Sequence, residues 1–125
     1  AEGARMPQTF IAEARSPAQA AFLAAWERAT GSVRIPVPPA AAQGYDSMQL
    51  LAAAIRQAGS LDGPRIREAL ENLDAEVDGV IMRYRRPFSR DNHETLRSAR
   101  QIHLGEIRDG AVVFAHEAAP ERPGP

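Results

Sequence analysis

Four residues, Gln43, Gly44, Tyr45 and Asp46, stand together near the start of the largely apolar stretch of residues 40–59, and their types could support ligand binding. They stand near the start of an expected helix, where free amide groups and the positive end of the helix dipole suit Asp46 itself or a polar ligand from outside. A structural role accounts for them equally: Asp46 would stabilise the first turn and Tyr45 would pack beneath a proline-rich segment. Taken alone, these residues favour the structural role.

A metal site is a second possibility, because the sequence DNHE at residues 91–94 has side chains of types that bind metals, and His103 or His116 could add a ligand. Helix-borne metal ligands lie three or four residues apart on one face, whereas this run lies in a stretch without periodicity. A solvated loop with local turn hydrogen bonds explains the run better. We therefore expect no metal and no cofactor.

A cluster of four arginines could bind a phosphate or a carboxylate. Its members are Arg83, Arg85, Arg86 and Arg90. Alternation along the chain sends Arg83 and Arg85 to the polar face of an expected strand, and Asp91 or Glu94 could pair with the cluster. A solvated, ion-paired face is the preferred interpretation.

Composition and motifs exclude several functions. The sequence has no GxSxG motif, no glycine-rich phosphate loop and no cysteine, so we expect no catalytic residue and no enzyme, although a small hydrolase stays open because fold does not fix function. The net charge of -1 leaves no excess of positive charge for binding nucleic acid. A chain of 125 residues, 44% hydrophobic, suits one modest core.

Helices are expected in the first half of the chain. Ser16 followed by Pro17 is a good helix start. Gly31 is expected to end this helix in a left-handed conformation, as glycine commonly does. Residues 32–39, SVRIPVPP, must be extended because of their prolines; we call them the proline strap.

The stretch 40–59 is then a helix that Gly59 ends, and its apolar residues cover most of its circumference, so we expect it to be covered on more than one side. One face is expected to carry Tyr45, Met48, Ala52 and Ile55. The run DGP at 62–64 opens a third helix with an apolar stripe.

Strands are expected at both ends of the chain. Residues 4–10 form a short strand that Pro7 confines to a sheet edge, and residues 80–84, VIMRY, alternate as a strand does. Residues 86–99 are expected to form a polar loop. A hairpin over 102–114 turns at Asp109 and Gly110, and a frayed tail follows at 117–125.

The order of these motifs resembles the C-terminal third of the periplasmic substrate-binding proteins of branched-chain amino acid ABC transporters. The strongest part is AAAQGYDSMQLLAAAIRQAGS, followed by a helix and DGV, and the loop PFSRDNHE fits one branch of that family. The resemblance covers the chain up to about Phe114 and implies an α/β fold, the C-terminal fragment of a two-lobed protein of the type I periplasmic binding fold. About three helices and a few strands, including a C-terminal hairpin, would belong to it.

The resemblance also implies a division of the chain. Residues 1–10 would be a hinge or second-lobe strand, 11–100 the helical part of one ligand-binding lobe, and 101–116 the hinge and C-terminal hairpin, with 117–125 a disordered tail. The sequence starts without methionine, so we expect it to be a piece of a longer protein.

The function implied is periplasmic solute capture for ABC-type import, with a small-molecule ligand and the transporter permease as partners. The family's ligand contact just before the YD pair matches Ala42, with Gln43 and Tyr45 close by. Because Ala42 is small where an aromatic residue can stand, the ligand would be an amino acid or, with the extra room, an aromatic carboxylate.

Two further expectations follow. The fragment lacks the strands of its lobe, so the apolar faces of Phe22, Trp26, Leu51 and Ile55 would lack partners. The chain would then self-associate, or it is one piece of a clipped longer protein. The alternative function is an independent α+β protein–protein interaction module that uses the same apolar helix.

Overall fold

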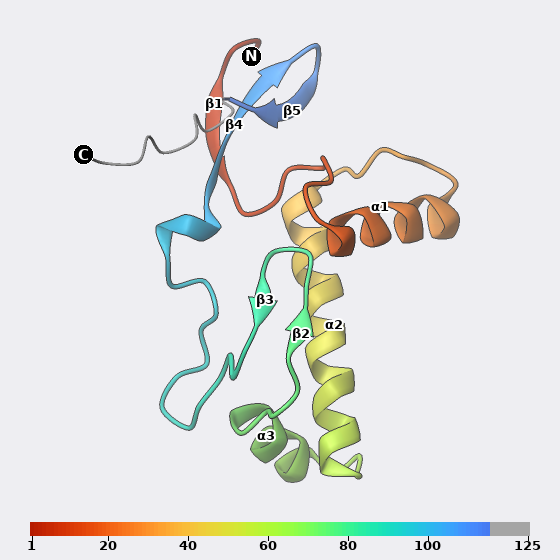
Figure 1. The fold of residues 1–125 in the computed structure, drawn as a ribbon. Coiled ribbons are helices and arrows are strands. Elements are labelled where there is room, and N and C mark those ends of the chain that lie inside the picture. The colour runs from red at the N-terminus through yellow and green to blue at the C-terminus, as the bar shows by residue number, and fades with distance from the viewer. Residues whose placement is uncertain (116–125) are drawn as a thin grey trace, which may run out of the picture.

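The long helix α2 organises the chain, with a small sheet at its N-terminal end and a short helix at its C-terminal end (Figure 1). The computed structural model describes residues 1–115. Its elements are, in order, β1 (Arg5–Gln8), α1 (Pro17–Thr30), α2 (Pro38–Ala58), α3 (Gly63–Glu71), β2 (Val77–Asp78), β3 (Arg83–Tyr84), the 3₁₀ turn η1 (Ala99–Gln101), β4 (His103–Arg108) and β5 (Ala111–Phe114).

Helix α1 begins and ends where the sequence predicts. The Ser16 side chain accepts a hydrogen bond from the Gln19 amide at 3.2 Å, and Pro17 takes the first helical position, where a missing N–H costs nothing. Gly31 ends the helix with φ 71°, a left-handed conformation that glycine adopts without strain.

The proline strap connects α1 to α2, and its last two residues already belong to α2. The Trp26 indole N–H donates to the Arg34 carbonyl at 3.2 Å, which holds the strap against α1. Val33 and Val37 remain 76% and 59% exposed. Gly59 ends α2 with φ 59°, as predicted.

The buried face of α2 differs from the predicted one. It consists of Ala42, Asp46, Leu50 and Ala54. Met48 was expected on the covered face, but its side chain is 62% exposed. Alanine fills so much of the helix that the apolar period is weak, and the burial of a carboxylate gives no hydrophobic signal at all. The flank from Leu50 to Ile55 is buried or half-buried.

Helix α3 packs beside the C-terminal part of α2 (Figure 1). The Asp62 carboxylate accepts a hydrogen bond from the Arg65 amide at 3.4 Å and caps the helix, which confirms the predicted start. Ala69 and Leu73 are buried with Leu50 and Ala54 of α2 in one core cluster.

The prediction of a strand over residues 80–84 is wrong for residues 80–82, and only Arg83 and Tyr84 are in a strand. The chain forms a tight hairpin instead, in which Val77 pairs with Tyr84 and Asp78 with Arg83. Residues 79–82 are its turn, closed by a 3.0 Å hydrogen bond from the Gly79 amide to the Met82 carbonyl. The alternating pattern is misleading here because a side chain of α2 takes the turn amides that a strand would use.

A three-stranded sheet of order β1–β4–β5 lies beyond the N-terminal end of α2 (Figure 1). The predicted C-terminal hairpin is confirmed: Asp109 and Gly110 both have positive φ at the turn joining β4 to β5. β1 pairs antiparallel with β4 and is an edge strand, as Pro7 requires. The predicted tail at 117–125 lies outside the described residues.

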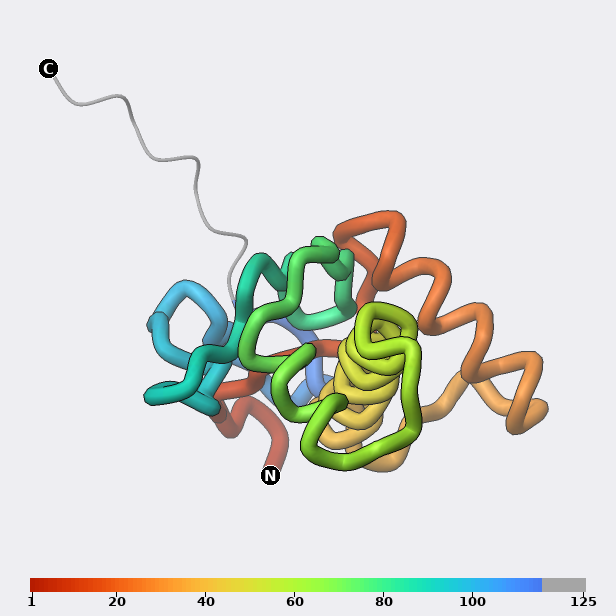
Figure 2. Tube along the Cα trace, turned by 90° about the horizontal axis from the view of Figure 1, so that it is seen from below, coloured from red at the N-terminus to blue at the C-terminus, as the bar shows by residue number. Residues whose placement is uncertain are grey.

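A second core cluster surrounds Phe22, which corrects the expectation that this face would be left bare. Phe22 is 3% exposed, because Phe10 and Tyr45 pack edge-on against it at centroid distances of 5.8 and 5.1 Å. Trp26, Leu51 and Ile55 are half-buried. Figure 2, which views α2 end-on, shows α1 on one side of it and the β2–β3 segment on another.

Within residues 1–115, no helix combines the length and the apolar character needed to cross a membrane.

Candidate functional site

The three residues predicted to contact a ligand have different surroundings. Ala42 is 0% exposed and lies in the core beside Phe22. Tyr45 is half-buried and packs on the same cluster. Gln43 is exposed, and its side-chain amide donates to the Thr9 hydroxyl at 3.3 Å. Of the three, Gln43 therefore has side-chain surface that a ligand can reach in this structure.

Asp46 has a role that sequence reasoning missed. It lies in the third turn of α2 and not in the first, and it is 1% exposed. Its carboxylate accepts hydrogen bonds from the Val80 amide at 2.7 Å, the Ile81 amide at 3.0 Å and the Tyr84 hydroxyl at 2.8 Å. A buried carboxylate needs such partners, and here they join the hairpin turn to α2. We call this arrangement the Asp46 clamp.

The turn is also held from α1. The Gln19 side-chain amide donates to the Val80 carbonyl at 3.1 Å, so the Val80 peptide is bound on both sides. Gly79 fits beneath the clamp because it has no side chain: a Cβ there would lie 2.6 Å from Asp46 Oδ2 and 2.5 Å from the Tyr84 ring. The sequence signal was the DG pair at 78–79, which also marks turns.

The clamp changes the acidity of its phenol. Burial raises the pKa of Tyr84, and the hydrogen bond to the Asp46 carboxylate raises that pKa further. Both effects keep Tyr84 protonated, so it remains a hydrogen-bond donor to Asp46 at neutral pH.

A small hollow opens next to the clamp, between α2, the β3 end of the hairpin and the following loop. Its volume is about 140 Å³. It is lined by Gln43, Ser47, Leu50, Ile81, Tyr84, Phe88, Thr95 and Leu96. We call it the turn hollow; all its lining residues are uncharged.

A second hollow, the strap hollow, lies between the proline strap and the sheet and has a volume of about 520 Å³. Its lining consists of Pro7, Gln8, Thr9, Pro36, Val37, Pro38, Pro39, Gln43 and Val112. Gln43 lines both hollows, which places its amide between the sheet and the helical part of the chain.

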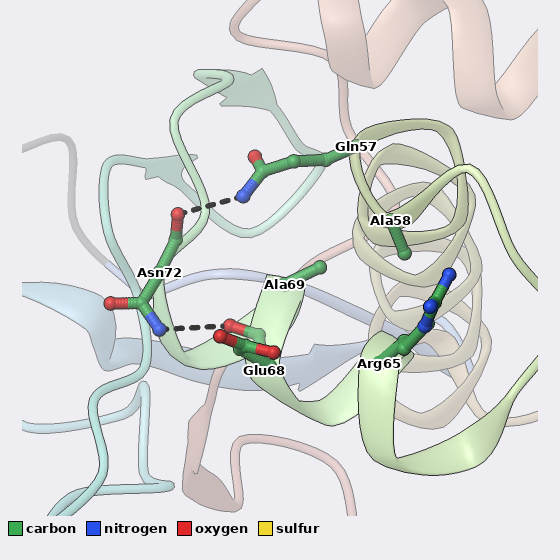
Figure 3. A pocket seen from close by; sticks show the side chains of 6 residues that line it. All are labelled: Gln57, Ala58, Arg65, Glu68, Ala69 and Asn72. Carbon is green, nitrogen blue, oxygen red and sulfur yellow. Dashed lines mark hydrogen bonds between the residues drawn. The ribbon is translucent and has the colours of Figure 1, made fainter.

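Another hollow, of about 450 Å³, lies at the opposite end of α2, between that end and α3 (Figure 3). There Gln57 donates from its side chain to the Asn72 carbonyl at 2.9 Å. Gln57 is 14 residues beyond Gln43, about 21 Å along a helix at 1.5 Å per residue. This hollow is therefore separate from the residues that the sequence singled out.

The DNHE run at 91–94 is part of the loop, as the preferred interpretation predicts. The Asn92 side chain donates to the Glu94 carbonyl at 2.9 Å, and His93 Nε2 lies 3.1 Å from Glu71 Oε1. His103 packs edge-on against Phe114, with ring centroids 5.4 Å apart. Within residues 1–115, no three or more His, Asp or Glu side chains are grouped so that they could hold a metal ion. His116 lies outside the described residues.

Three of the four arginines in the cluster form ion pairs, but with other partners than expected. Arg83 and Arg85 lie 3.4 and 3.0 Å from Glu76, and Arg86 lies 3.4 Å from Asp74. The hairpin brings β3 back beside the residues that precede β2, so these acidic side chains are closer than Asp91 or Glu94.

Comparison with a solved structure confirms the fold expected from the sequence. The chain matches a solute-binding protein of an ABC transporter from R. palustris, solved in complex with benzoate, with a TM-score of 0.65 and 20% identity. The match covers 91% of this chain and 29% of that one, so this chain spans less than a third of its neighbour. At this identity the likeness shows the fold: an α/β chain with the structure of part of a periplasmic binding protein.

The family follows from the sequence match. The model of the periplasmic binding protein family matches residues 1–111, and the chain belongs to that family. No curated protein matches it.

Proposed function

We propose that this chain takes part in solute capture for ABC-type import, as part of a protein that closes around a small ligand. The family match over residues 1–111 carries this proposal. Differential contact with the ligand in the closed form would drive closure, because a ligand shifts a conformational equilibrium only through unequal affinity for its states. The proposed location is the periplasm, and the proposed protein partner is the transporter permease.

The division of labour along the chain follows the same proposal. Residues 11–100 form the helical part of one lobe, while residues 1–10 and 101–116 supply the hinge and part of the second lobe. Pairing of β1 with β4 supports this division, because it joins the two ends of the described chain in one sheet apart from α2 and α3 (Figure 1).

Gln43 is the residue that we propose to contact the ligand directly. Its amide can both donate and accept, and it stands at the junction of the turn hollow and the strap hollow. Ala42 and Tyr45 act on the same site from beneath: they pack the helix start against Phe22 and so fix the direction of Gln43.

The proposed ligand is a small carboxylate, either an amino acid or an aromatic acid. Because both hollows have uncharged linings, the part of the ligand that contacts them should be neutral and largely apolar. A carboxylate needs hydrogen-bond donors or a cation. The Gln43 amide can supply a donor, whereas a cation would lie outside the two hollows. The benzoate found in the R. palustris protein makes aromatic acids the first compounds to test.

Calorimetric titration of the full translated protein that contains this chain tests the proposal, with benzoate and a panel of branched-chain and aromatic amino acids as ligands. We expect at least one to bind with a dissociation constant in the micromolar range or tighter. Gln43→Ala should weaken the binding of that ligand. Gln49→Ala, on an exposed part of the same helix, should leave its affinity unchanged. Absence of binding by every acid would contradict the proposal.

A further inference from the structure

We infer that the turn hollow is the subsite for a single six-membered aromatic ring of the captured solute. This inference rests on the proposed function, because it assigns a place to the apolar part of the same ligand. It goes further in naming the shape and size of the group that this part of the chain selects.

The volume of the turn hollow sets the size of its occupant. At about 140 Å³ it is close to the roughly 150 Å³ of an apolar protein cavity that binds benzene. The hollow is open on its solvent side, so a fused two-ring group would extend beyond its walls and lose part of the contact that a single ring makes. The strap hollow, at about 520 Å³, would leave a single ring loosely held.

The walls of the turn hollow fit an apolar, planar group. Leu50, Ile81, Phe88 and Leu96 supply carbon surface from three separate parts of the chain. Phe88 can pack edge-to-face with an aromatic ring, an arrangement that aromatic pairs prefer. The polar groups that share the lining are neutral, so the hollow offers no opposite charge to a buried ion and favours an uncharged ring.

The hollow is formed before any ligand arrives, since hydrogen bonds hold its walls. The Asp46 clamp fixes Ile81 and Tyr84 against α2. On the loop side, the Gln101 side chain donates to the Thr95 carbonyl at 3.0 Å, and Ser89 pairs with Asn92 next to Phe88. A preformed site loses less conformational entropy on binding than one that must be ordered.

Ser47 gives a way to close the hollow without disturbing the core. Its side chain is exposed and lies at the edge of the hollow. Ser47→Phe would fill the space with a ring of its own. The matched control is Gln49→Phe, which adds the same ring to an exposed position of α2 that lines none of the hollows described.

The test is to titrate the full translated protein and both variants with benzoate, 2-naphthoate and benzene. Binding is monitored by NMR through the amide chemical shifts of Ser47, Ile81 and Thr95. We expect benzoate and benzene to shift these amides and 2-naphthoate to shift them less at the same concentration. Ser47→Phe should weaken benzoate binding by about tenfold or more. Gln49→Phe should bind benzoate as the parent does. Thermal unfolding of both variants checks that each is folded.

The outcomes separate this inference from the proposed function. If benzoate binds the parent and Ser47→Phe equally well, the ring subsite is wrong while solute capture stands. If benzene shifts the three amides but no carboxylate binds, the hollow accepts a ring and solute capture is wrong. If neither benzene nor any acid shifts these amides, the ring subsite is overturned.

Discussion

The Tyr84 hydroxyl donates a 2.8 Å hydrogen bond to the buried Asp46 carboxylate, across 38 residues of sequence. This contact connects β3 to α2 and forms part of the wall of the turn hollow. Because its acceptor is charged and buried, the bond belongs to the stronger class of protein hydrogen bonds.

Tyr84→Phe should therefore lower the free energy of unfolding by about 1.5–3 kcal/mol, the range for hydrogen bonds to charged groups. Urea titration measures the loss. Tyr45→Phe is the matched control, because among residues 1–115 the Tyr45 hydroxyl takes part in no hydrogen bond, and it should cost far less. Equal losses in the two variants would show that the hydrogen bond from Tyr84 to Asp46 adds nothing to the free energy of unfolding.

Gly79→Ala should destabilise the chain by about 1–3 kcal/mol, because the new methyl group overlaps Asp46 and Tyr84 in a packed region. Gly44→Ala should have the opposite sign. Gly44 lies within α2 with open space around it, and alanine is favoured there by about 0.5–1 kcal/mol. Chemical denaturation of both variants compares the two glycines; a neutral Gly79→Ala would mean that the turn relaxes freely.

Stability should fall in alkaline solution because of Tyr84. Its pKa is raised in the folded chain, so above the ordinary tyrosine value near 10 the unfolded chain loses this proton first and unfolding becomes easier. The stabilising contribution is thus complete below about pH 10 and decreases as pH rises, by up to about 1.4 kcal/mol per pH unit. Urea titrations between pH 8 and 11 should show a shallower decrease for Tyr84→Phe than for the parent.

Val37→Ser should stabilise the chain by about 0.5–2 kcal/mol, the usual value of a helix N-cap. Val37 holds the N-cap position of α2 and provides no side-chain hydrogen bond to the free amides. Val33→Ser, in the same strap but outside the cap, should be close to neutral. The shift in melting temperature distinguishes them, and identical shifts would rule out capping as the cause.

Self-association remains a prediction. Several apolar side chains are exposed, among them Leu61 at 81%, Val33 at 76% and Met48 at 62%. Exposed apolar surface of this kind favours contact between copies. Sedimentation velocity of the 125-residue chain over a hundredfold concentration range should show growing oligomers. A single monomer species at high concentration would contradict the prediction.

The sequence by itself determined the ends of the elements. Ser16 and Asp62 cap helices, and Gly31 and Gly59 end them, as predicted. The C-terminal hairpin turns at Asp109 and Gly110, also as predicted. These features are local: a side chain bonds to an amide two or three residues away, or a glycine adopts a left-handed conformation, whatever the rest of the chain does. The order of the elements was likewise enough to indicate the family that the match over 1–111 confirms.

Tertiary structure alone decided which face of α2 is buried and what residues 79–82 become. Alanine-rich helices give a weak apolar period, and the determining contact joins Asp46 to Val80, Ile81 and Tyr84, more than 30 residues away. The turn hollow exists for the same reason, since its walls come from α2, the hairpin and the loop. Such contacts depend on where distant segments meet, and no local pattern of residues encodes that meeting.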